Sequence, residues 1–177
     1  MSRKASIFCR SLVLSLVAGL LLNSCNSVND DVIPSIPVYL NLTSASLWNT
    51  YGVAGYGDYR IFVKELRQPS NFAYTEQTST GYGGVLLING TNPFTLEAGV
   101  PVAYDLACPV ERRADVRLSM QKSDLFPIAV CPVCGSKYDV VERGGSPIEG
   151  PALADKLGLR RFECREGAYG GYLIFNY

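Results

Sequence analysis

The feature that most constrains the fold of this chain is the distribution of its apolar residues, which occur in short stretches separated by glycine, proline and asparagine. In one of them, Val38, Leu40 and Leu42 alternate with more polar neighbours, a period of two that is typical of a half-buried β-strand. Similar stretches predict strands at residues 59–65, 84–88, 100–107, 116–120, 126–130, 159–164 and 172–175. Residues 152–157 are the one helical candidate. The pattern predicts a single all-β domain, an antiparallel barrel or sandwich.

Two connecting segments carry specific expectations. Asn89-Gly90 is a favoured tight-turn pair, so we expect it to end the strand that begins at residue 84. Residues 46–58 are rich in glycine, tyrosine and asparagine and predict a loop, in which Trp48 is the expected packing anchor.

The N-terminus has the layout of a secretory signal. Arg3, Lys4 and Arg10 precede an apolar run over residues 11–22, which is too short for the ~20 residues of a membrane-spanning helix. The run leads into Asn23-Ser24-Cys25, which resembles a lipoprotein box, where the cysteine is acylated and becomes the first residue of the mature protein.

Cleavage before Cys25 divides the chain into a signal peptide (1–24), a polar tether (25–37) and one domain (38–177). The expected location is the cell envelope, with a lipid anchor in the outer or inner membrane and the domain facing the periplasm or the surface. The chain has 16 basic and 16 acidic residues, so its charge does not favour a nucleic acid partner.

Four of the six cysteines lie within the predicted domain, and two strand-like stretches run directly into Cys108 and Cys131. The second leads into the segment Cys131-Pro132-Val133-Cys134-Gly135-Ser136-Lys137-Tyr138-Asp139, which is followed by Gly150-Pro151-Ala152. This order resembles the Rieske iron–sulfur family, whose second loop reads Cys-Pro-x-His-Gly-Ser-x-(Phe/Tyr)-Asp and is followed by Gly-Pro-Ala. The resemblance covers roughly residues 85–177 and implies a Rieske-like antiparallel barrel or sandwich with two cysteine-bearing loops.

The ligands of a Rieske centre are incomplete in this sequence. Such a [2Fe–2S] centre holds one iron with two thiolates and the other with two imidazoles. The chain contains no histidine: Val110 occupies the place of the first-loop histidine and Cys134 that of the second. The usual Rieske centre is therefore excluded. By the same resemblance, Ser136 and Tyr138 would hydrogen-bond to the sulfur of any cluster, although both also suit purely structural roles.

Three uses of Cys108, Cys131 and Cys134 remain open. An all-thiolate [2Fe–2S] centre needs a fourth ligand, which Cys164 supplies only if its strand passes the loop ends; otherwise Cys164 is a small buried apolar residue. A zinc or rubredoxin knuckle fits the Cys131 segment, with Glu111 as a fourth ligand from the other loop. A disulfide between Cys108 and either Cys131 or Cys134 suits an oxidising compartment.

These readings leave two classes of function. The first is a membrane-anchored module that binds a metal or an iron–sulfur centre through cysteines, for electron transfer with a redox partner. The second is a metal-free or disulfide-bridged scaffold for binding or assembly. We do not expect an enzyme, because the chain offers no histidine as a general base and no phosphate-binding loop.

Overall fold

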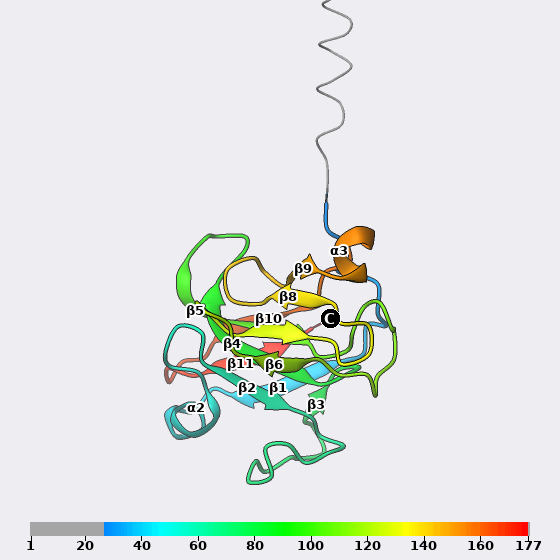
Figure 1. The fold of residues 1–177 in the computed structure, drawn as a ribbon. Helices are drawn as coiled ribbons and strands as arrows, with labels where there is room; N and C mark the ends of the chain where they lie inside the picture. Colours follow the sequence, from blue (N-terminus) through cyan, green and yellow to red (C-terminus); the bar gives the residue numbers. More distant parts are fainter. Residues whose placement is uncertain (1–26, 177) are drawn as a thin grey trace, which may run out of the picture.

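The computed structural model describes residues 27–176 (Figure 1). Its strands are β1 (Val38–Leu42), β2 (Tyr59–Phe62), β3 (Ser79–Thr80), β4 (Val85–Thr91), β5 (Ala98–Asp105), β6 (Ser119–Gln121), β7 (Ile128–Val130), β8 (Lys137–Asp139), β9 (Ser146–Glu149), β10 (Arg161–Glu166) and β11 (Tyr172–Phe175). Two short helices are α2 (Ala45–Tyr51) and α3 (Pro151–Asp155). A seven-stranded antiparallel sheet of order β2-β4-β5-β10-β11-β1-β3 curls nearly into a barrel, and β6-β7-β8-β9 form a second sheet. The all-β prediction is confirmed.

The residues of β4 explain how the two sheets pack. Leu86 and Ile88 lie in a core shared with the four-stranded sheet, whereas Val85 and Leu87 lie in a second core on the opposite face of the large sheet. All four side chains are fully buried, as expected for a continuous apolar run in a strand that is covered on both sides. We call these the shared core and the barrel core.

The expected turn at Asn89-Gly90 is wrong, because β4 continues to Thr91 and Gly90 pairs with Val100 of β5. A Cβ atom at Gly90 would lie 2.6 Å from the carbonyl oxygen of Val141, so this glycine permits a close approach of backbone from the second sheet. The chain turns after Asn92 instead, where the Asn92 side chain accepts the N–H of Phe94 at 2.9 Å.

The expected loop over residues 46–58 begins with the helix α2. Ser44 caps this helix by accepting the N–H of Leu47 at 3.3 Å, a local signal that the glycine-rich composition of the segment obscured. Trp48 is a packing anchor as expected: its ring contacts that of Tyr172, with 4.8 Å between centroids, at the edge of the barrel core.

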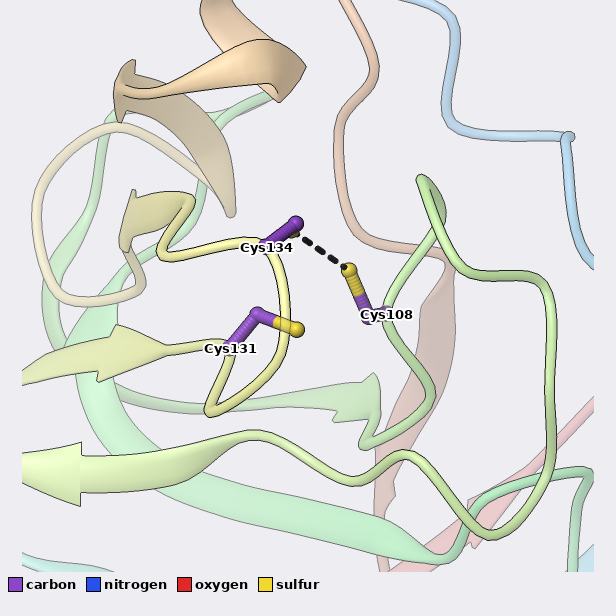
Figure 2. A group of neighbouring side chains, drawn as sticks. All are labelled: Cys108, Cys131 and Cys134. Carbon is purple, nitrogen blue, oxygen red and sulfur yellow. Dashed lines mark hydrogen bonds between the residues drawn. The ribbon is translucent and has the colours of Figure 1, made fainter.

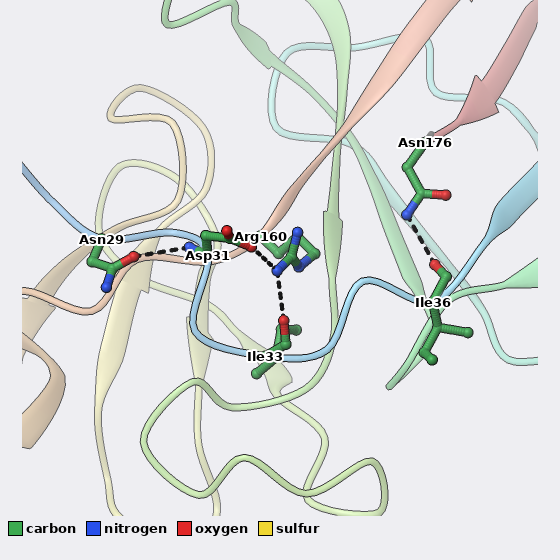
Figure 3. A network of polar contacts seen from close by, with 6 residues as sticks. All are labelled: Asn29, Asp31, Ile33, Ile36, Arg160 and Asn176. Carbon is green, nitrogen blue, oxygen red and sulfur yellow. Dashed lines mark hydrogen bonds and ion pairs between the residues drawn. The ribbon is translucent and has the colours of Figure 1, made fainter.

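The segment predicted as a tether differs from that expectation over residues 29–36, which are held against the domain (Figure 3). The Arg160 guanidinium donates both to the Asp31 carboxylate and to the carbonyl oxygen of Ile33, whose side chain is buried. These partners come from far along the chain, so the polar composition of the segment could not reveal the contacts.

The predicted signal peptide and Cys25 lie outside the described residues. In the part of the chain that the structure describes, no helix has both the length and the apolar character needed to cross a membrane.

Candidate metal centre

The first cysteine-bearing loop is held by the carboxylate of Asp105 at the end of β5. This carboxylate accepts the backbone N–H groups of Tyr82 at 3.0 Å, Gly83 at 2.9 Å and Ala107 at 2.8 Å. Burial raises the pKa of Asp105 to about 6, and the three N–H groups oppose that rise. A Cβ atom at Gly83 would lie 2.4 Å from the Ala107 nitrogen, so the glycine lets the two backbones meet just before Cys108.

The second loop leaves β7 and returns at β8. The Cys131 N–H donates to the Ser136 carbonyl at 2.9 Å, and the Gly135 N–H donates to the Cys131 carbonyl at 3.1 Å. Gly135 has a φ of 71°, which a glycine adopts without strain. The loop is thus a tight turn whose ends are joined by backbone hydrogen bonds.

The two loops bring three thiols together (Figure 2). The sulfur atoms of Cys108, Cys131 and Cys134 all lie within 4.8 Å of one another, and those of Cys108 and Cys134 are 3.6 Å apart. Cys108 and Cys131 are buried, whereas Cys134 is partly exposed. All three are free thiols, since 3.6 Å is far longer than the roughly 2.05 Å of an S–S bond. The structure therefore does not contain the disulfide that the sequence left open.

Hydroxyl groups of the second loop and of the strand β8 that follows it contact two of these sulfur atoms. The Ser136 oxygen lies 3.1 Å from the Cys134 sulfur and also accepts the N–H of Ala152, at the start of α3, at 3.1 Å. The Tyr138 oxygen lies 3.7 Å from the Cys108 sulfur. Ser136 and Tyr138 are both fully buried. They thus combine the structural and the sulfur-contacting roles that the sequence suggested.

The environment of each sulfur sets its proton affinity. Burial raises the pKa of the Cys108 thiol to about 12, against the hydrogen bonds it receives from the backbone of Glu111 and Val110. Burial acts in the same direction on Cys134, but its hydrogen bonds with Ser136, Cys131 and Cys108 outweigh it and the net pKa is lowered. Burial, followed by the nearby Cys108 sulfur, raises the pKa of Tyr138, so its phenol stays protonated and available as a donor.

Cys164 is not part of this group. It lies in β10 opposite Ile174 of β11 and packs against the barrel core, whereas the three-cysteine group belongs to the shared core. The strand of Cys164 does not pass the loop ends, so this residue does not supply a fourth thiolate.

The geometry suits one metal ion. With Zn–S bonds near 2.3 Å, sulfur atoms at the corners of a tetrahedron lie about 3.8 Å apart, close to the observed 3.6 Å. A two-iron cluster needs ligands spread over two irons, and the described chain gathers only three thiols, all within 4.8 Å. The usual Rieske centre does not fit, because no imidazole exists to bind its second iron.

Sequence reasoning identified all three members of the group but missed the contacts that hold them. Asp105 belongs to no motif in the sequence, and its hold on the first loop depends on Tyr82 and Gly83, which lie more than 20 residues earlier. The signal that could have revealed this contact is an acidic residue at the end of an otherwise apolar strand, because a buried carboxylate needs hydrogen-bond donors around it.

No family model, curated protein or solved structure was found to match this chain. The likeness to the Rieske family therefore rests on the sequence motif alone and stays a prediction.

Proposed function

We propose that this chain is a cell-envelope lipoprotein whose Rieske-like domain binds a single metal ion through Cys108, Cys131 and Cys134. The observation that carries the proposal is the convergence of three free thiols from two loops within 4.8 Å. Thiolates bind zinc, cuprous copper and iron well, and three of them in one place are hard to explain by packing alone.

The surroundings of the site support this proposal. Metal binding requires thiolates. Burial raises the pKa of Cys108, but the backbone N–H groups of Val110 and Glu111 oppose that rise, and the pKa of Cys134 is lowered by its hydrogen bonds with Ser136. The loops are also fixed before any metal arrives, by Asp105 on one side and by the contact between Ser136 and Ala152 on the other. A site prepared in this way binds a metal at a smaller entropic cost.

The lipid anchor at Cys25 and the envelope location complete the proposal. The anchor would keep the metal centre beside a membrane, where a redox or assembly protein could reach the partly exposed Cys134. With iron the centre would exchange electrons, whereas with zinc it would be redox-silent. The disulfide-bridged form of the scaffold has less support, because the three cysteines are free thiols.

The test is metal analysis of the full chain, expressed in its host and purified without oxygen or chelators. We expect one equivalent of metal per chain, and addition of a strong chelator should make the three thiols reactive toward a thiol reagent. A brown colour with two irons and two sulfides per chain would replace the single ion with a cluster. Metal-free protein with a disulfide between the loops would refute the proposal.

A further inference from the structure

The two cysteine-bearing loops share a sequence and a backbone shape. They read Cys108-Pro109-Val110-Glu111-Arg112 and Cys131-Pro132-Val133-Cys134-Gly135. In each loop the N–H of the fifth residue donates to the carbonyl of the first, at 2.9 Å in the first loop and 3.1 Å in the second. In each, the fifth residue also has a positive φ, 53° in the first and 71° in the second. The first loop is therefore a second copy of the knuckle formed by the other.

This match gives Glu111 a defined place. It occupies the fourth position of its knuckle, where the other knuckle carries Cys134. We propose that Glu111 is the fourth ligand of the metal centre, so that two knuckles supply three sulfurs and one carboxylate oxygen to a tetrahedral zinc ion. The inference rests on the proposed metal site and names the ligand that completes it.

The carboxylate of Glu111 is free to take this role. It is partly buried, and within residues 27–176 it makes no hydrogen bond or ion pair. The other acidic side chain of the loop, Asp115, is already paired with Arg113 at 2.6 Å. The Glu111 carboxylate is not among the groups that lie within 4.8 Å of one another, so metal binding requires its side chain to move toward the three sulfurs.

The remaining polar atoms near the sulfurs are poorer ligands. Ser136 already accepts a backbone N–H from Ala152, and the Tyr138 hydroxyl is a neutral phenol that lies 3.7 Å from the Cys108 sulfur. The chain has no histidine. Zinc accepts both thiolate and carboxylate ligands and takes four of them in closed sites, so the donor set of this centre suits zinc.

The test measures zinc and cobalt binding to the full chain and to three variants. Glu111→Gln keeps the size of the side chain but removes its charge, and Glu111→Cys makes both knuckles alike. Glu142→Gln is the matched control, because Glu142 is an exposed acidic residue of another loop. Zinc affinity is measured by competition with a chelator, and cobalt serves as a spectroscopic probe of geometry and of the number of thiolates.

We expect a tetrahedral cobalt spectrum with three thiolates for the unchanged chain. Glu111→Gln should lower zinc affinity roughly tenfold or more, whereas Glu142→Gln should leave it unchanged. Glu111→Cys should increase the sulfur-to-cobalt charge-transfer absorption by roughly a third, as three thiolates become four.

Two outcomes would overturn the role of Glu111 and leave the three-thiolate site intact. One is unchanged zinc affinity in Glu111→Gln. The other is a three-coordinate cuprous site that the chain prefers over zinc. Failure of the unchanged chain to bind any of these metals would refute the site as well, so the two proposals fail in different ways.

Discussion

Cys164 and the three-cysteine group show how differently one residue type behaves in two regions of the same domain. Cys164 lies within a strand, beside the barrel core, where burial alone raises the pKa of its thiol to about 12. Cys134 lies at a loop end beside the shared core, where hydrogen bonds lower its pKa in spite of burial. A strand presents a side chain to an apolar layer, whereas a knuckle surrounds it with backbone N–H groups. Burial raises the pKa of Cys108 as much as that of Cys164, but only Cys108 also receives hydrogen bonds from backbone N–H groups. The donors around a sulfur therefore distinguish the proposed ligands from the packing residue, whereas burial does not.

The largest expected effect separates these two regions directly. Cys131→Ser removes one of the three thiolates and should weaken metal binding by roughly 100-fold or more. Cys164→Ser changes the same atom in the barrel core and should leave metal affinity unchanged. Both affinities can be measured by chelator competition on the full chain. Equal losses in the two variants would mean that the contrast between the regions is wrong.

The next prediction compares substitutions at two glycines that both have a positive φ. A Cβ atom at Gly150, φ 83°, would lie 2.9 Å from the Ser136 Cα atom beside the metal loop, whereas at Gly170, φ 79°, it would meet nothing within 4 Å. Gly170→Ala should cost about 1 kcal/mol of unfolding free energy through backbone strain alone. Gly150→Ala should cost about 2–4 kcal/mol, because the clash adds to that strain. Denaturant unfolding measures both, and Gly150→Ala should also weaken metal binding.

A third prediction concerns Asp105, whose folded pKa of about 6 exceeds its usual value of 3.8. The folded state therefore binds this proton more tightly than the unfolded state. The stabilisation that the proton provides is complete below about pH 4 and is lost as the pH rises through 6, an effect of up to about 3 kcal/mol. Asp105→Asn should flatten this part of the stability profile, whereas substitution of the exposed Asp124 by asparagine should not. A metal-free sample separates the effect from the pH dependence of metal binding.

The sequence predicted the fold class from strand periodicity, which is a local signal, and it singled out Cys108, Cys131 and Cys134 through the resemblance to the two cysteine-bearing loops of the Rieske family. The sequence-based prediction was wrong where a residue pattern typical of a turn instead serves a contact with a distant part of the chain. Asn89-Gly90 has the composition of a turn, yet Gly90 serves the approach of Val141 from another sheet. β10 does alternate, with Phe162 buried and Glu163 and Arg165 exposed, so its period places Cys164 on the inner face of the strand. The period does not say which of the two cores that face meets, and this is what separates Cys164 from the site.

The smallest expected change in stability comes from the N-terminal segment, residues 29–36, which is held to the domain partly by ion pairs such as that between Asp31 and Arg160. Asp31 is largely exposed and its partner Arg160 is not, so Asp31→Asn should cost at most about 1 kcal/mol of global stability. Locally, residues 29–36 should exchange their amide hydrogens faster, because the same guanidinium also holds the carbonyl of Ile33. Hydrogen exchange of the full chain at low and high salt provides the measurement. High salt should mimic the substitution in this segment and leave the exchange of the two cysteine loops unaltered, since Asp105 and Ser136 hold those loops from within the fold.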